Sequence, residues 1–132
     1  MLAYHATMGF ALAGGLTACA SADATDQAAF APEYLGVDIR PLDNDLANVF
    51  VSMRGARDRA DVAAYADCAA ADYAKKWHFG YLRHIRTRVS KTNGQWKGDA
   101  IYVFSPEKPL GEKTIDAAVR LADCTKNGIP RV

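Results

Sequence analysis

The chain has 132 residues, of which 50% are hydrophobic and 23% are charged. This length and composition are typical of one globular domain and exclude wholesale disorder. The formal net charge is +1, from 16 basic and 15 acidic residues. Because no strong overall field draws the protein to nucleic acid, we expect no nucleic-acid partner.

The first eighteen residues are expected to be a signal peptide. Residues 6–18 are uncharged and rich in small and apolar side chains. Such a run is too short to cross a hydrocarbon core about 30 Å thick, but it suits a signal peptide. Residues 1–5 contain no Lys or Arg, although this part of a signal peptide is normally basic. The alternative is a short buried helix with Cys19 in the core, because free cysteines are commonly buried.

The end of this run, Leu16-Thr17-Ala18-Cys19, resembles the lipobox of bacterial lipoproteins, in which a branched apolar residue and two small residues precede a cysteine. The resemblance implies a diacylglyceryl group on the Cys19 thiol, cleavage just before Cys19 and acylation of the new amino terminus. The three acyl chains would anchor the protein firmly. In such lipoproteins an Asp after the cysteine favours the inner membrane, so Ala20 favours the outer membrane.

The resemblance also divides the chain. Residues 1–18 would be the signal, and residues 19–33 the lipidated cysteine and a flexible tether of small, polar, weakly acidic residues. Residues 34–132 would form a domain that faces the periplasm. The chain as a whole is similar to small uncharacterised lipoproteins of bacterial envelopes.

The two remaining cysteines, Cys68 and Cys124, are expected to form a disulfide. Without Cys19 the count is even, and the periplasm is oxidising. Two buried free thiols are an alternative. A catalytic thiol is another, with His78 or His84 as its base, but no nucleophile motif surrounds either cysteine.

The first half of the domain is expected to contain extended segments and one helix. Residues 46–53 read as a strand, and a short extended piece over residues 34–39 ends at Pro41. A helix follows from Asp58 or Arg59 to about Trp77, with acidic residues near its start and lysines near its end. Its apolar stripe consists of Val62, Ala66, Ala69, Tyr73 and Trp77. Cys68 lies off this stripe, so it should point away from the sheet.

The second half is expected to contain a hairpin and a second helix. Residues 81–91 and 100–104 read as strands joined around the turn signal Asn93-Gly94. From Thr114, a candidate N-cap, to Asn127 the pattern favours a helix, although residues 115–121 also alternate as a strand would. The helical stripe would be Ile115, Ala118, Val119 and Ala122, with Cys124 at its edge. The order β-α-β-β-α predicts an α+β domain with two helices on one face of a small, mostly antiparallel sheet.

A basic strand is the main candidate for ligand binding. Residues 73–98 contain no acidic residue, and His84, Arg86 and Arg88 should alternate onto one face of their strand. That face suits an anionic lipid or glycan of the envelope, or an acidic protein. The plainer interpretation is a solvated face whose charges protect a sheet edge.

Other residue patterns indicate structure more than chemistry. Residues 42–46 read as a turn with an Asx cap because a calcium loop needs more ligands. Trp77 is expected in the core and Trp96 over a turn. We find no zinc spacing, phosphate loop or catalytic motif, and expect neither a metal nor a cofactor. The sequence therefore predicts a non-enzymatic structural or interaction module, held at a membrane by its lipid; a binding protein for an anionic lipid or glycan is the alternative.

Overall fold

The computed structural model describes residue 14, residues 30–111 and residues 113–132. Its elements are β1 (Glu33–Asp43), β2 (Leu46–Arg54), α2 (Arg59–Lys76), β3 (Tyr81–Thr92), β4 (Gln95–Ser105), β5 (Thr114–Asp116) and α3 (Ala117–Lys126). The strands form one antiparallel sheet in the order β1-β2-β4-β3-β5. The expected α+β class and the β3–β4 hairpin are confirmed. The expected element order contained too few strands, because it lacked the β1–β2 hairpin and β5.

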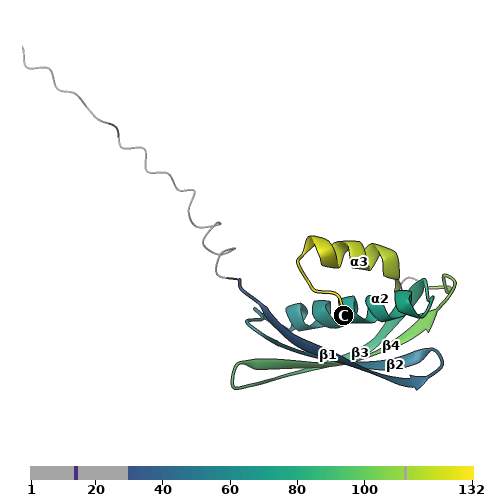
Figure 1. Ribbon diagram of the computed structural model, residues 1–132, viewed down its shortest axis with the longest axis horizontal. Coiled ribbons are helices and arrows are strands. Elements are labelled where there is room, and N and C mark those ends of the chain that lie inside the picture. The colour runs from purple at the N-terminus through teal and green to yellow at the C-terminus, as the bar shows by residue number, and fades with distance from the viewer. Residues whose placement is uncertain (1–13, 15–29, 112) are drawn as a thin grey trace, which may run out of the picture.

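The two helices lie on the same side of the sheet but in successive layers (Figure 1). Helix α2 packs across β2, β3 and β4, whereas α3 packs on α2 and touches the sheet mainly through β5. The opposite face of the sheet carries no helix among the described residues. The core therefore lies between the sheet and α2, and a second, smaller contact layer joins α2 to α3.

Two short turns set the register of the sheet. Asn93 and Gly94 both have positive φ, at 52° and 77°, which suits a two-residue turn that matches the strand twist. Between β1 and β2 the turn residues are Asn44 and Asp45, and the Asn44 backbone N–H donates to the Asp43 side chain at 2.7 Å.

Pro41 lies within β1, where a missing N–H is tolerated because β1 is an edge strand.

Helix α2 begins as expected and owes its close packing to small residues. The Asp58 side chain accepts a hydrogen bond from the Ala60 backbone N–H and caps the helix. Its buried alanines let the helix approach both the sheet and α3. The helix lies close to Gly98 of β4, where an added Cβ would lie 2.8 Å from the Val62 side chain.

The start and the buried face of α3 differ from the sequence prediction. Residues 114–116 pair with β3 as β5, and Asp116, not Thr114, caps the helix by accepting from the Ala118 and Val119 backbone N–H groups. The predicted stripe was wrong: its residue Val119 is 59% exposed. The buried residues are Ala117, Leu121 and Cys124, because α3 packs on a helix and not on the sheet.

The two tryptophans occupy different environments. Trp77 is 63% exposed at the C-cap of α2, so its predicted place in the core was wrong. The helix has already left the sheet by that residue, and the aromatic core beneath it is formed by Tyr73, Phe79 and Phe104. Trp96, one residue into β4, packs partly buried beside the Asn93-Gly94 turn, as expected.

The predicted signal peptide, Cys19 and most of the tether lie outside the described residues. Strand β1 already includes Glu33, the last residue of the predicted tether. Within the described ranges, no helix has the length and apolar character needed to span a membrane.

Candidate interaction surface

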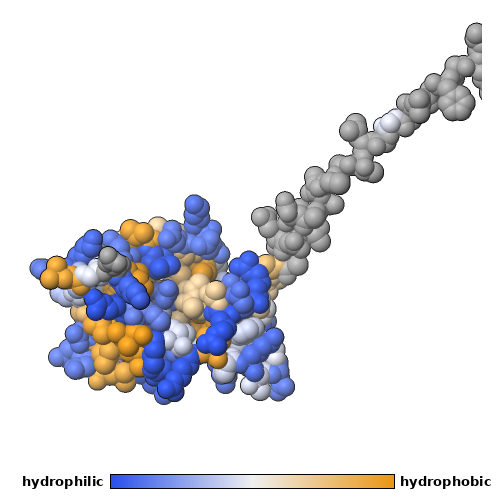
Figure 2. Space-filling model, turned by 180° about the vertical axis from the view of Figure 1, so that it is seen from behind, coloured by the Kyte–Doolittle hydropathy of each residue, from blue (hydrophilic) through white to orange (hydrophobic). Residues whose placement is uncertain are grey.

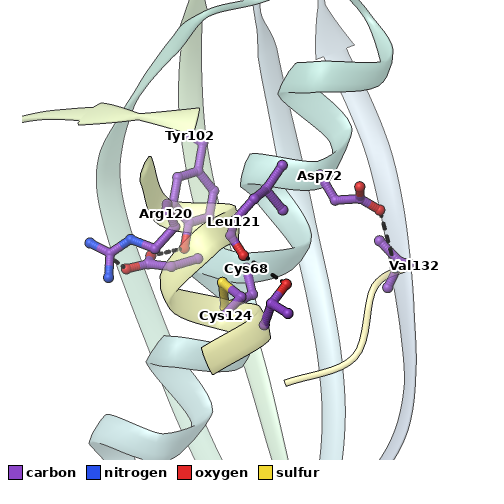
Figure 3. The surroundings of a disulfide bond; sticks show 9 residues. Cys68, Asp72, Tyr102, Arg120, Leu121, Cys124 and Val132 are labelled. Atoms are coloured by element: carbon purple, nitrogen blue, oxygen red, sulfur yellow. Dashed lines mark hydrogen bonds and ion pairs between the residues drawn. A yellow bond between two sulfur atoms is a disulfide. The ribbon is translucent and has the colours of Figure 1, made fainter. Parts of the chain in front are cut away.

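Cys68 of α2 and Cys124 of α3 form a disulfide, as predicted from the sequence (Figure 3). Their Cα atoms lie 5.9 Å apart, and both residues are buried, at 5% and 3% exposure. Leu121 of α3 packs in the same layer. Because the bond uses both thiols, the alternatives of two free thiols or a catalytic thiol do not fit this structure.

A polar contact connects the sheet to both helices beside the disulfide (Figure 3). The Tyr102 hydroxyl of β4 donates to the Asp67 carboxylate of α2 at 2.5 Å, and the Arg120 guanidinium of α3 lies 3.9 Å from the same carboxylate. Burial of Tyr102, followed by the nearby Asp67 charge, raises its pKa well above 10. Tyr102 therefore stays protonated at neutral pH and serves as a buried donor.

The predicted basic face does not form as expected, because a β-bulge separates its members. His84 pairs with Tyr102, whereas Arg86 pairs with Ile101, so Ile85 is the extra residue. Neighbouring residues on β4 point to opposite faces, and their partners follow them. His84 therefore lies on the helix side, its ring centroid 5.4 Å from that of Tyr102. Arg86 and Arg88 lie on the opposite face, which we call the open face.

The open face combines aromatic, apolar and charged side chains in rows set by the register. One row contains Arg40, Asn48, Ile101 and Arg86, and the next contains Asp38, Phe50, Asp99 and Arg88. Phe50 lies between two shallow hollows of about 400 and 380 Å³. Both hollows are also lined by Lys97. The centre of the face is therefore an aromatic ring with both acidic and basic side chains around it.

The charges on this face are unequally paired. Arg40 lies 2.9 Å from Asp38 and also stacks over the Phe50 ring at 4.8 Å. Arg86 lies 3.8 Å from Asp99, and the facing atoms of this pair are buried without a hydrogen bond. Arg88 and Lys97 have no acidic partner within 4.0 Å in the part of the chain that the structure describes. These two cations, next to Phe50, are therefore available to bind an anionic group.

Figure 2 shows the surface of the domain from behind. Hydrophilic residues cover most of this view, with an apolar area at its lower left. An apolar hollow of about 170 Å³ also lies next to the bulge, lined by Ile85, Val103 and Pro109 among others. Apolar and basic side chains, such as Ile85 and Arg83, therefore lie close together on β3. Interaction surfaces commonly combine these two kinds of side chain.

Other residues singled out in the sequence have structural places. Asp43, Asn44 and Asp45 belong to the β1–β2 turn, as predicted, and in the described ranges no group of three His, Cys, Asp or Glu residues could hold a metal ion. His78 lies directly after α2 with φ at 63°, where it ends the helix.

Sequence reasoning overlooked Phe50 and Lys97 as members of the surface. A signal was present, because β2, which contains Phe50, and β4, which contains Lys97, both alternate between buried and less buried residues. A strand with this alternation has one face on the core and one face free. Assigning that free face, however, needed the order of strands in the sheet.

Comparison with known proteins places this domain in a family. The family described as the YNQ4 C-terminal domain matches residues 34–128. The chain belongs to this family. It is also 34% identical over 87 residues to the "Uncharacterized 26.9 kDa protein in nqo8 5'region" of Paracoccus denitrificans. The match covers 66% of this chain and 34% of that protein, so the chain corresponds to about a third of its relative. No solved structure matches the chain significantly.

Proposed function

We propose that this protein is a non-enzymatic interaction module of the bacterial envelope, which binds an anionic partner through the open face of its sheet. The observation that carries the proposal is the composition of that face. Phe50 lies between two hollows, and Arg88 and Lys97 beside it lack acidic partners among the described residues. An aromatic anchor with two unpaired cations beside it suits a partner that is apolar at its centre and carries acidic groups nearby.

The family match supports a module. The family is described as a C-terminal domain, and the Paracoccus protein is about three times as long as the matched segment. In that relative the domain is therefore part of a considerably longer chain. This is the behaviour of a folded unit that is attached to a membrane or to other domains and supplies a binding surface.

An acidic protein is the leading partner, and an anionic lipid or glycan is the second candidate. Arg88 and Lys97 favour either one through charge. The two hollows around Phe50 favour the protein, because a side chain can fill a hollow whereas a head group contacts mainly the charges.

A matched pair of variants tests the surface. Arg88→Glu with Lys97→Glu reverses the unpaired cations, and Arg59→Glu with Lys126→Glu makes the same charge change on the exposed surface of the helices. We expect only the first variant to lose its partners in a pull-down from membranes. Equal capture by the two variants would rule out the open face as the binding surface.

The same two variants distinguish a protein partner from lipid. Full-length protein is mixed with vesicles of a neutral lipid containing an anionic phospholipid and then sedimented. Selective loss of vesicle binding in Arg88→Glu with Lys97→Glu would support the lipid, and unchanged vesicle binding with lost pull-down would support the acidic protein.

We propose that Cys19 anchors this module, with residues 1–18 removed as a signal and an outer-membrane destination. The support is the lipobox resemblance of Leu16-Thr17-Ala18-Cys19. An oxidising compartment also agrees with the disulfide between α2 and α3. Palmitate labelling in cells should be lost in Cys19→Ser. A mature amino terminus at Met1 would contradict both cleavage and lipidation.

A further inference from the structure

An aromatic groove lies at the end of α2, on the helix side of the sheet and away from the open face. It has a volume of about 290 Å³ and is lined by Pro41, Asp43, Asn44, Tyr73, Trp77 and Phe79. Trp77 is the most exposed of its aromatic residues, at 63%. A large aromatic side chain that stays this exposed contributes little to the core and is available for contact with a ligand.

The Trp77 ring is supported from below by other aromatic rings. Its centroid lies 6.1 Å from that of Tyr73, which in turn lies 5.1 Å from Phe104. The ring of Phe79 lies 5.6 Å from Phe104 on the other side. These contacts connect the buried Phe104 through Tyr73 to the exposed Trp77.

The backbone around Trp77 is also held in place. The His78 N–H donates to the Lys75 carbonyl at 3.2 Å, and the Phe79 N–H donates to the Ala74 carbonyl at 2.8 Å. This helix ending usually carries glycine after the C-cap, because that residue needs positive φ. Here His78 adopts φ of 63°. Trp77 is therefore presented on a fixed turn, which lowers the entropy lost when a ligand orders its ring.

The β1–β2 turn supplies polar groups to the groove. Asp43 and Asn44 are both exposed at the groove, and the Asn44 N–H fixes one oxygen of Asp43. The second carboxylate oxygen and the Asn44 amide remain as acceptor and donor. No basic side chain lies within 4.0 Å of Asp43 in the described ranges.

We propose that this groove binds a pyranose ring of an uncharged glycan. The apolar face of the sugar would stack on Trp77 and Pro41, and its hydroxyls would bond to Asp43 and Asn44. An organic cation would also be drawn to aromatic rings and a carboxylate. However, a cation is usually enclosed by rings on several sides, whereas here the Tyr73 ring packs against Phe104 and Trp77, and Trp77 is mostly exposed to solvent. The geometry therefore favours the sugar.

Tryptophan fluorescence tests this site directly. The chain has two tryptophans, so Trp96→Phe leaves Trp77 as the reporter. Full-length Trp96→Phe protein is titrated with a cello-oligosaccharide, with an oligomer of N-acetylglucosamine and with tetramethylammonium chloride. We expect a saturable change in Trp77 emission with at least one oligosaccharide and none with tetramethylammonium.

Calorimetry with matched variants assigns the contacts. Trp77→Ala should weaken oligosaccharide binding by about tenfold or more, and Asp43→Ala by a smaller factor. Trp96→Phe is the control and should bind as the unaltered chain does. Because Trp77 is mostly exposed, Trp77→Ala should keep the circular dichroism spectrum and the melting temperature close to those of the parent.

Three results would overturn the proposal: no binding of either oligosaccharide, equal binding by Trp77→Ala, or saturation by tetramethylammonium alone. The last result would make the groove a cation site. These substitutions do not alter the open face. If the groove fails to bind a sugar, the proposal that the open face binds an anionic partner still stands. If the open face fails to bind a partner, the sugar proposal still stands.

Discussion

Removal of the disulfide should greatly reduce the stability of this domain. The bond joins residues separated by 56 positions. In the chain-entropy model, a loop of this length lowers the unfolded-state entropy enough to stabilise the folded state by about 4 kcal/mol. A domain of this size has a total stability of only about 5–15 kcal/mol. Cys68→Ala with Cys124→Ala should therefore leave the domain with only a small free energy of unfolding.

The test is urea unfolding followed by far-ultraviolet circular dichroism. With a slope of about 2 kcal/mol per molar urea, the double variant should unfold about 2 M earlier than its parent. Cys19→Ser is introduced into both chains to prevent thiol exchange, and the parent chain treated with reductant is the matched control. Alanine is used because both sulfur atoms are buried, and serine would bury a hydroxyl.

The local part of the effect can be separated from the global part. Without the bond, α3 is held on α2 by a few contacts, chiefly the buried residues Ala117 and Leu121 and the ion pair between Arg120 and Asp67. Amide hydrogens of α3 should therefore exchange faster than those of α2 in the double variant. A loss of less than about 1 kcal/mol, with unchanged exchange in α3, would refute this account of the bond.

Three further predictions concern the core and its ionisable groups. Gly98→Ala should cost about 1–3 kcal/mol in urea unfolding, because the new Cβ would meet the Val62 side chain at 2.8 Å and the Val51 side chain at 2.9 Å; full stability in this variant would show that these side chains or α2 can shift. Asp61 has a lowered pKa, mainly through its hydrogen bonds from Arg57. Its contribution is present above about pH 4 and is lost as the pH falls further, so the difference in melting temperature between Asp61→Asn and its parent should vanish in acid. Tyr102 has a raised pKa, mainly through burial, so the folded state should lose stability as the pH rises above about 10. Tyr102→Phe should reduce that high-pH loss, and an unchanged pH profile would contradict the assignment.

The local signals in the sequence were sufficient for several elements. Asn93-Gly94 specifies a tight turn because both residues tolerate positive φ, and the structure places them in that turn. Asp58 caps α2 because its side chain reaches a backbone N–H two residues away. The direction of Cys68, away from the sheet, also followed from helical periodicity alone. Each of these properties depends on a few neighbouring residues.

Properties that depend on a distant partner were decided only by the tertiary structure. His84 and Arg86 lie on opposite faces because pairing with β4 introduces a bulge at Ile85, which strict alternation within β3 cannot predict. The buried face of α3 depends on the disulfide and on its packing against α2, so Val119 is exposed although it is apolar. The exposure of Trp77 likewise depends on where α2 leaves the sheet. Turns and helix caps depend on short-range steric effects and hydrogen bonds between adjacent residues. Whether a side chain is buried or exposed, and on which face it lies, depends on the elements that pack beside it.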